Sequence, residues 1–444
     1  MRRFFSVLLM LIVTAGVLII FTAPPALSDT GPNPEEIQSL EWLRAQIVPN
    51  TQIPAPTPQR RGLMLSYAAG TELPSTPAHR KCFVYDAAVA SIAFGMAGDW
   101  SRASMVLQAL ARAQRSDGSF WFSYNVENTW PEDGDHDMAI VRAGATAWVG
   151  YAFAFYVETR PAGTDARLMR ERASLLDTAR RVADFLLTLR VTEKTAQQGL
   201  LRGGRAFVKL QLDAAGTVTE VYDNGPVLWV STEHNISSYF FLTSMHRLTG
   251  NLRYAAAADA IRAGLMATLW QPDLQQFAQG VSKDGSVDRT QALDCASWGA
   301  LFLLATGETE KAELAVKTAD RVYANVHNGV KGYRPYDGKP IYDNVRIQRV
   351  LLPETPRVQW QDFSLVWSEG TLGVALAHAR LGHTDQAGAL TAEMLKLRDK
   401  GGIRYSSREL PYEMSASPSI AGTAWHVIME ETLRNPHAAT FWSR

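Results

Sequence analysis

Six segments of the chain repeat one pattern, in which a stretch rich in Ala, Gly and aromatic residues follows a carboxylate or a polar cluster. The six stretches begin at Tyr85, Val141, Ser231, Leu293, Trp367 and Pro418. Each has helical length and few charges, so it needs burial on two sides. The pattern therefore requires an interior that is itself built from helices.

Between these stretches the periodicity predicts amphipathic helices with one charged face. They are expected at residues 34–48, 100–114, 168–190, 252–269, 308–326 and 384–398. A ring of six sparsely charged inner helices inside a ring of six amphipathic outer helices gives both kinds the burial they need. The sequence therefore predicts an all-α fold, an (α/α)6 barrel. Alternating residues at 199–222 and 332–352 predict small β-hairpins in its loops.

The N-terminus begins with Met1, two arginines and a long apolar run, which is typical of an export signal. We predict residues 1–28 to be a signal peptide, or an uncleaved membrane anchor because the run is about long enough to span a bilayer. Residues 29–60 follow as an N-terminal helix and a Pro-rich segment, and residues 61–444 as the barrel domain. The barrel is then expected to be periplasmic or secreted.

Charge gives a further constraint on partners. Lysine and arginine together number 44, as do aspartate and glutamate, and no basic run occurs. This balance argues against a nucleic-acid-binding surface and against electrostatic docking to a membrane. We expect a monomer that contacts a membrane only through the possible N-terminal anchor.

The two cysteines fall on opposite sides of the predicted ring. Cys82 precedes the first inner helix and Cys295 lies inside the fourth. A disulfide needs Cα atoms within about 7 Å of each other. We therefore expect two separate, buried thiols.

In a barrel of this kind the inner helices run in the same direction, so their N-terminal ends share one face. The carboxylates at these ends then meet in one acidic mouth. Each acid alone is most often a helix cap or dipole partner, worth up to about 1–2 kcal/mol. Capping does not explain the set, because Trp and Tyr accompany the acids at nearly every helix start.

Two glutamates are the strongest candidates for chemistry. Glu233 and His234 lie in a first turn and Asn235 lies further along the same helix, and such polar groups are costly to bury without partners. Glu369 follows a serine that is expected to cap the helix, and it precedes Gly370, which lets a neighbouring helix or ligand come close. Each has a structural alternative: His234 and Asn235 bond loop carbonyls and lock the helix entry, and Glu369 serves only as a capping carboxylate.

An acidic loop precedes the second inner helix. Asp133, Asp135 and Asp137 alternate there as in a calcium-binding loop. That loop requires Gly at its sixth position and Glu at its twelfth, where this chain has Met138 and Gly144. We therefore predict no metal site and no cofactor, and we include Asp137 in the catalytic set as a ligand of water or substrate.

The other candidates are expected to contact a substrate, since polar side chains bind hydroxyl groups and aromatic rings offer flat apolar faces. They are Tyr85, Asp86, Trp121, Trp130, Asp135, Arg142, His234, Asn235, Asp294, Trp298, Trp360, Asp362 and Trp367. Asp362, one loop before Glu369, is also the alternative acid to Glu369.

The plan of twelve helices, with acids and aromatics at the inner starts, resembles the six-hairpin glycosidase-like superfamily over residues 34–434. The stretch ARAQRSDGSFW at 111–121 is similar to the Q-x-x-D-G-S-aromatic turns of α/α toroids. Ser-Glu-Gly at 368–370 and Asp-Gly-Asp at 133–135 look like pieces of the family 8 glycoside hydrolases. Their order along the chain is reversed, so no residue roles are carried over from that family.

The resemblance implies carbohydrate chemistry outside the cytoplasm. Glycoside hydrolysis needs one carboxylic acid that protonates the leaving oxygen and one carboxylate that activates water or attacks carbon. A crowded, partly buried acidic mouth supplies the raised pKa that the acid requires. We expect Glu233 and Glu369 to be this pair in a glycoside hydrolase.

Two other interpretations stay open. A polysaccharide lyase on the same barrel would use Tyr239, His234 and Asn235 to abstract the proton next to a uronate carboxylate. Arg142 would neutralise that carboxylate, although an acidic mouth disfavours an anionic substrate. The third interpretation is a non-catalytic glycan-binding protein of exopolysaccharide export.

Overall fold

The computed structural model describes residues 31–68, 80–129, 139–435 and 441–442, and the barrel unit spans Pro32–Arg444. Six helices form its interior: α2 (Val84–Met96), α4 (Ala143–Thr159), α6 (Thr232–Thr249), α8 (Leu293–Ala305), α11 (Ser368–Arg380) and α13 (Ile420–Arg434). Each packs against the next along the chain, and α13 closes the ring against α2. The inner ring predicted from the sequence is confirmed.

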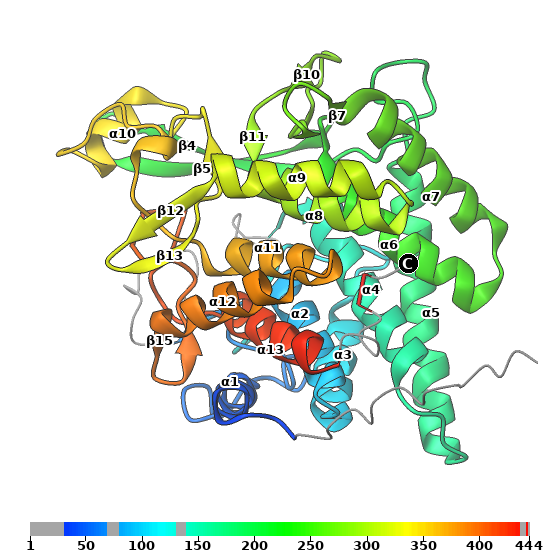
Figure 1. The fold of residues 1–444 in the computed structure, drawn as a ribbon. Coiled ribbons are helices and arrows are strands. Elements are labelled where there is room, and N and C mark those ends of the chain that lie inside the picture. The colour runs from blue at the N-terminus through cyan, green and yellow to red at the C-terminus, as the bar shows by residue number, and fades with distance from the viewer. Residues whose placement is uncertain (1–30, 69–79, 130–138, 436–440, 443–444) are drawn as a thin grey trace, which may run out of the picture. The chain divides into compact units, whose positions relative to one another are not determined.

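Six outer helices enclose this ring: α1 (Pro34–Ala45), α3 (Trp100–Ala113), α5 (Ala166–Thr188), α7 (Leu252–Gly264), α9 (Thr309–Val322) and α12 (Thr384–Met394). Helices α3, α5, α7, α9 and α12 each pack on the inner helix that precedes them, and α1 packs on α13. In Figure 1 the inner helices α2, α11 and α13 lie in the middle of the drawing, with α1, α5, α7 and α9 around them. The fold is an (α/α)6 barrel, as predicted.

Four outer helices and four inner helices begin in different ways. The outer helices α1, α3, α5 and α7 begin at Asn or Asp residues whose side chains accept a backbone N–H of the first turn. The inner helices α2, α4, α8 and α11 have no side-chain cap, and α2, α4 and α8 follow the short strands β1 (Lys81–Phe83), β3 (Val141–Arg142) and β11 (Gln291–Ala292). Ser368, the expected cap of α11, instead donates to the carbonyl of Tyr405 at 2.9 Å. The acids of these first turns are therefore not used as caps.

Antiparallel pairs of short strands surround the starts of the inner helices. Strand β3 pairs with the hairpin β4 (Gly204–Leu212)–β5 (Val218–Val227), and β6 (Val230–Ser231) pairs with β9 (Gly280–Val281), which pairs with β10 (Val287–Asp288). The other pairs are β1 with β2 (Ser123–Asn125), β7 (Trp270–Gln271) with β8 (Gln276–Phe277), β11 with β14 (Tyr336–Asp337), β12 (Ala324–His327) with β13 (Val330–Tyr333) and β15 (Arg398–Asp399) with β16 (Gly402–Ile403).

The first predicted hairpin is confirmed as β4–β5, which reaches the short helix α10 (Val345–Leu351). The second prediction is partly wrong, because α10 occupies the end of the stretch that was expected to be strand. Asn344 begins this helix by accepting the backbone N–H groups of Arg346 and Ile347 at 2.9 and 3.4 Å. The cap decided the local structure against an alternating apolar pattern.

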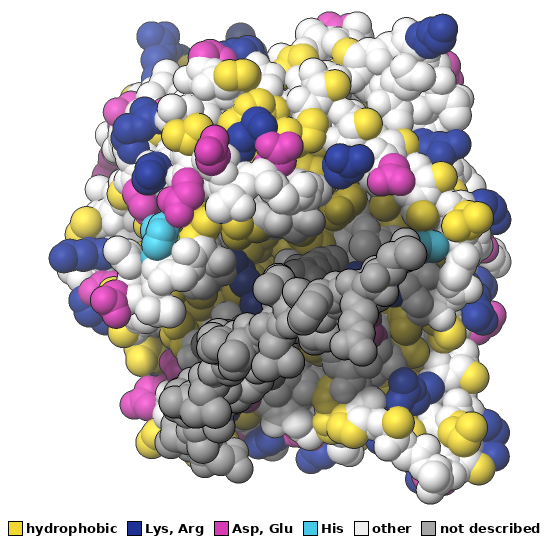
Figure 2. Space-filling view, turned by 45° about the vertical axis from the view of Figure 1, so that its right-hand side comes forward, with side chains coloured by type: hydrophobic (Ala, Val, Ile, Leu, Met, Phe, Trp, Pro, Cys, Tyr) yellow, Lys and Arg dark blue, Asp and Glu magenta, His cyan; other side chains and the backbone are white. Residues whose placement is uncertain are grey.

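The interior and the surface agree with the composition. Cys82 and Cys295 are both buried and free, as expected. Figure 2 shows Lys and Arg interspersed with Asp and Glu over the face that it draws. None of the described helices combines the length and the hydropathy that a membrane span needs. The predicted signal or anchor, residues 1–28, lies outside the described residues.

The contact of α4 with its neighbours gives a stability prediction. A Cβ at Gly150 of α4 would lie 2.5 Å from Phe241 of α6 and 2.8 Å from Val182 of α5. Gly150→Ala should therefore lower the free energy of unfolding by about 1–3 kcal/mol in a urea titration. Gly388→Ala, in α12 with open space around the new methyl group, should be neutral or stabilising by up to about 1 kcal/mol. Equal effects of the two substitutions would contradict this packing.

Candidate active site

Four inner helices each place one carboxyl group in their first turn. Asp86 is the third residue of α2, and Glu233, Asp294 and Glu369 are the second residues of α6, α8 and α11. Asp86 and Glu369 are only 7% and 6% exposed, and Glu233 and Asp294 are half-buried. The ring of helices therefore gathers four acids, from distant parts of the chain, into one desolvated cluster. We call these four residues the carboxyl cluster.

Burial dominates the electrostatics of the carboxyl cluster. It raises the pKa of Asp86 and of Glu233 to about 7 and that of Glu369 to about 8. Burial, with the charges of Glu233 and Glu369, raises the pKa of Asp294 well above its usual range. The charge of Glu233 raises the pKa of both Asp294 and Glu369, and the charge of Asp86 raises that of Glu369, so these carboxyls titrate as a linked set that keeps protons near neutral pH.

Two tyrosines and a tryptophan fix Glu369. Tyr85 donates its hydroxyl hydrogen to Oε1 of Glu369 and accepts from Nε1 of Trp425 at 2.8 Å. A second hydrogen bond, from Tyr405, also favours the ionised form of Glu369. Burial and the Glu369 charge raise the pKa of Tyr85 well above its usual range, so its hydroxyl stays a donor. Glu369 is thus the best-anchored carboxyl of the cluster.

Tyr336 lies between the carboxyl cluster and an outer acid. Its pKa is raised by burial and by the charges of Asp294, Glu413 and Glu233. Glu413 is exposed, although the protein around its carboxyl raises its pKa to about 7. Its exposure places Glu413 at the rim of the site rather than in the cluster.

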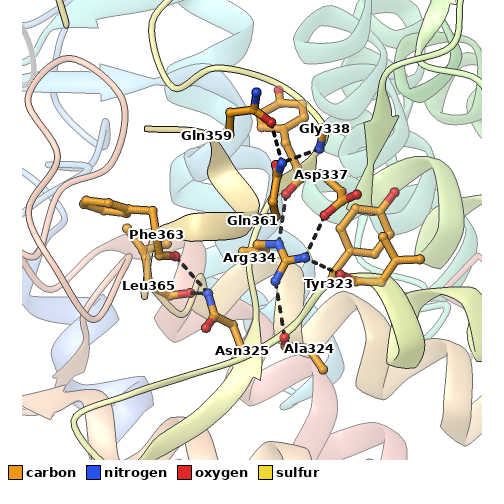
Figure 3. Close-up of polar contacts among 12 residues, drawn as sticks. Tyr323, Ala324, Asn325, Arg334, Asp337, Gly338, Gln359, Gln361, Phe363 and Leu365 are labelled. Atoms are coloured by element: carbon orange, nitrogen blue, oxygen red, sulfur yellow. Dashed lines mark hydrogen bonds and ion pairs between the residues drawn. The ribbon is translucent and has the colours of Figure 1, made fainter. Parts of the chain in front are cut away.

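A polar network holds the loop that carries Tyr336 (Figure 3). Arg334 donates to the Tyr336 carbonyl at 3.2 Å and to Asp337 Oδ1 at 2.7 Å. Asn325 bonds the carbonyls of Phe363 and Leu365 at 3.0 and 3.1 Å. The Asn325 bonds join β12 to the segment before α11, and the Arg334 bonds hold the backbone of Tyr336 at a fixed place in the site.

Arg142 and His234 form a second polar group, beside the starts of α4 and α6. Arg142 lies over the ring of Trp229, 5.8 Å from its centroid, and donates to the Ala206 carbonyl at 2.5 Å. Burial lowers the pKa of Arg142 to about 10, and burial with the Arg142 charge lowers that of His234 to about 3. His234 is therefore neutral, and Gly144 makes room for its ring, since a Cβ there would lie 2.4 Å away.

Asn235 is committed to the backbone. It accepts from the Leu201 N–H at 2.8 Å and donates to the carbonyls of Leu201 and Ser231 at 3.1 and 2.8 Å. The side chain is fully buried, so it locks the loop before β4 onto α6. The contacts of Asn235 are those of the structural alternative, in which the side chain bonds loop backbone groups and fixes the start of the helix.

Four of the predicted aromatic platforms are buried. Trp121 is covered by Arg115, whose guanidinium lies 3.6 Å from its ring centroid. Trp298, Trp360 and Trp367 are 3%, 1% and 7% exposed. Because their faces are covered by protein, these rings do not offer open faces on which a sugar could stack.

The remaining candidates are divided by position. Asp362 is exposed on the 3-10 turn Trp360–Asp362 and is not among the groups that shift the pKa values of the cluster. Trp130, Asp135 and Asp137 lie outside the described residues. Within the part of the chain that is described, no three His, Cys, Asp or Glu residues are grouped as metal ligands.

The sequence analysis singled out Trp298 but missed that it belongs to a repeat with Trp148 and Trp425. Trp148, Trp298 and Trp425 are each the sixth residue of an inner helix, in α4, α8 and α13. Their ring centroids lie 5.4–6.1 Å apart, so they form a closed triangle under the first turns. The other three inner helices have Val89, Ser237 and Gly373 at this position. The shared Ala-rich approach to Trp in ATAW, CASW and GTAW was the available signal.

No protein-family model matches the chain. No curated sequence matches it significantly either. Solved structures do match. A D-mannose isomerase superposes with a TM-score of 0.58 at 12% identity, covering 94% of this chain and 100% of its own. A family 63 mannosylglycerate hydrolase from Thermus thermophilus gives 0.56 at 14%, covering 90% and 100%.

A family 76 glycoside hydrolase from a bovine Bacteroides thetaiotaomicron strain gives a TM-score of 0.52 at 11% identity, covering 90% of this chain and 76% of its own. At these identities the likeness shows the fold. The predicted resemblance to six-hairpin glycosidase-like (α/α)6 barrels is thus confirmed for the architecture.

The raised pKa of Glu369 predicts a pH-dependent stability. Between its ordinary pKa of about 4.5 and about 8 the folded protein holds a proton that the unfolded chain releases, so stability falls as pH rises through this window. Glu369→Gln removes this loss. From pH 5 to 8.5 its unfolding free energy should gain about 1–3 kcal/mol relative to the wild type. The exposed Glu354→Gln should show no such trend, and a flat difference for Glu369→Gln would contradict the buried proton.

The Asn235 lock predicts a stability effect. Asn235→Ala leaves a buried N–H and a buried carbonyl of Leu201 without their partner, which should cost about 2–4 kcal/mol in the free energy of unfolding. Asn251→Ala, which removes only the cap of α7, should cost about 1 kcal/mol. An Asn235→Ala protein of unchanged stability that fails to bind a glycan would instead show a substrate-binding role.

Proposed function

We propose that the protein is an exported glycoside hydrolase that cleaves an oligo- or polysaccharide by carboxylate acid–base catalysis. One observation carries this proposal: the first turns of four inner helices bring four carboxyls into one desolvated cluster whose pKa values are all raised. Glycoside hydrolysis requires a carboxylic acid that stays protonated near neutral pH beside a second carboxylate. The fold shared with the two glycoside hydrolases supports the same class.

Glu233 is assigned as the general acid. Burial alone raises its pKa to about 7, and no side-chain hydrogen bond to its carboxyl oxygens is found among the described residues. A carboxyl without donors around it gains little from ionising. It would give its proton to the glycosidic oxygen as the bond from that oxygen to the anomeric carbon breaks.

Glu369 is assigned as the general base. The hydroxyl groups of Tyr85 and Tyr405 both donate to it, and both bonds favour its carboxylate form. Burial outweighs them and raises the pKa of Glu369 to about 8, above that of Glu233, so the assignment rests on the donors around Glu369 and not on the order of the two pKa values. The two hydrogen bonds also fix the orientation of Glu369, which is what a base needs to hold a water beside the anomeric carbon. It would take the proton of the attacking water as the new C–O bond forms.

Asp294 and Asp86 are assigned to the substrate and to the proton balance. The charges of both Glu233 and Glu369 raise the pKa of Asp294, so Asp294 lies near both groups. Its Oδ1 is buried without a hydrogen-bond partner among the described residues. Asp86 is held by Ser66. Both would accept hydrogen bonds from sugar hydroxyl groups. Because these groups are uncharged, they suit an acidic site. The predicted export signal would place this activity outside the cytoplasm.

The lyase alternative is weaker, because its residues do not meet. Tyr239 faces the outer layer, where Arg262 and Asp259 of α7 affect its hydroxyl. Asn235, which would take part in the proton abstraction, is instead hydrogen-bonded to the backbone of Leu201 and Ser231. A glycan-binding protein would need no raised pKa at all.

The proposal predicts graded losses of activity. On a panel of neutral glycans, Glu233→Gln and Glu369→Gln should each lower kcat/KM by about 10²–10⁴-fold, because each removes one proton transfer. Glu354→Gln is the matched surface control and should keep wild-type activity. Release of reducing ends is the measurement.

Three outcomes would contradict the proposal. Full activity of Glu233→Gln would remove the acid from its role, and an unsaturated product with new ultraviolet absorbance would indicate a lyase. Conversion of free mannose to another hexose, without any glycan cleavage, would place the chemistry with the D-mannose isomerase that shares the fold.

A further inference from the structure

Phe441 and Trp442 lie inside the barrel, although α13 ends at Arg434. They are 0% and 2% exposed. The ring centroid of Trp442 lies 4.6 Å from that of Trp148, 5.1 Å from Trp298 and 4.8 Å from Phe240. In Figure 1 this short red stretch lies beside α4, at the end marked C. It fills the space between the inner helices.

The two residues are held at their backbone. Arg380, the last residue of α11, donates to the Phe441 carbonyl at 2.9 Å. The Trp442 N–H donates to the hydroxyl of Tyr151 in α4 at 3.0 Å. They therefore enter from the side of the inner helix C-terminal ends, opposite to the carboxyl cluster.

The pair covers the tryptophan triangle from below. Trp442 contacts Trp148 and Trp298, and Phe441 lies 5.7 Å from Trp425 and 5.9 Å from Trp148. All three indoles of the triangle thus rest on these two rings. Aromatic contacts of this kind fix the orientation of the rings as well as their depth.

The triangle in turn fixes Tyr85. Trp148 meets the Tyr85 ring edge to face, with centroids 5.2 Å apart, and Trp425 donates its Nε1 hydrogen to the Tyr85 hydroxyl at 2.8 Å. Tyr85 donates to Glu369. A continuous set of contacts therefore leads from the barrel floor to the carboxyl that is assigned as the base.

We propose that Phe441 and Trp442 are positioning residues: they form the floor of the barrel and, through the tryptophan triangle, hold Tyr85 where it donates to Glu369. Their effect on catalysis rests on the function proposed above, whereas their effect on Glu369 does not. A floor of this kind acts on the chemical step, because it touches neither the substrate nor the water. It sets the geometry of the base within the few tenths of an ångström that proton transfer needs.

The test compares three variants with the wild type. Trp442→Ala empties the floor, Trp442→Phe keeps an aromatic ring there, and Phe277→Ala removes a buried ring of strand β8 that packs on Trp270 and Phe302 and not on the triangle. Two quantities are measured: the titration midpoint of Glu369 by ¹³C-carboxyl NMR, and kcat and KM on the cleaved glycan.

For Trp442→Ala we expect the Glu369 midpoint to rise by about one pH unit, because the Tyr85 hydroxyl no longer stabilises its carboxylate. We expect kcat to fall about 10- to 100-fold with little change in KM. Trp442→Phe should restore most of both quantities. Phe277→Ala should lower the melting temperature and leave the Glu369 midpoint unchanged.

A wild-type Glu369 midpoint in a folded Trp442→Ala protein would overturn the proposal and leave the two rings as core filling only. If Trp442→Ala does not fold, the Glu369 midpoint of Trp442→Phe decides the question, since it should move in the same direction by less. Absence of glycan cleavage by the wild type would remove the proposed function, and the NMR titration would still test the positioning role.

Discussion

Desolvation of four carboxyl groups is the constraint on which the other features of this site depend. Asp86, Glu233, Asp294 and Glu369 lie at the positive ends of inner helices, where the helix dipole compensates part of the cost of burying a carboxylate. The remainder keeps protons on the cluster, as the raised pKa values indicate. Helices α2 and α8 begin directly after strands, and α11 begins after the backbone bridge between Trp367 and Ser406. The acids in the first turns of these three helices are therefore not used as helix caps.

The aromatic interior follows from the geometry of a six-helix ring, which leaves a space along its axis that small inner side chains cannot fill. Alternate inner helices supply Trp148, Trp298 and Trp425 at the same depth, and Phe441 and Trp442 close the space beneath them. The closed packing has a chemical consequence, since the same rings orient Tyr85. The same layer of aromatic rings therefore fills the barrel axis and positions the tyrosine that donates to Glu369.

The ring of helices could be predicted because low charge in six segments and amphipathic periodicity in six others leave few other arrangements. The meeting of Asp86, Asp294 and Glu369 followed from that ring. The hydrogen-bond partners of these acids could not be predicted in the same way. Tyr405 and Ser66 come from loops that carry no periodic signal in the sequence. Asn235 was ambiguous because a buried amide suits a ligand or a backbone equally well, and only the position of Leu201 distinguishes them. The strand predicted at the end of residues 332–352 is a helix, because Asn344 caps its first turn.

The central claim is that acids from separate inner helices form one proton-sharing cluster. It is tested most directly by ¹³C-carboxyl NMR titration of the wild type and of Glu233→Gln. The account predicts that Glu233 and Glu369 titrate above pH 6 in the wild type, and that the Glu369 midpoint falls when the neighbouring charge of Glu233 is removed. Titration of Glu369 near pH 4.5, unchanged in Glu233→Gln, would contradict it.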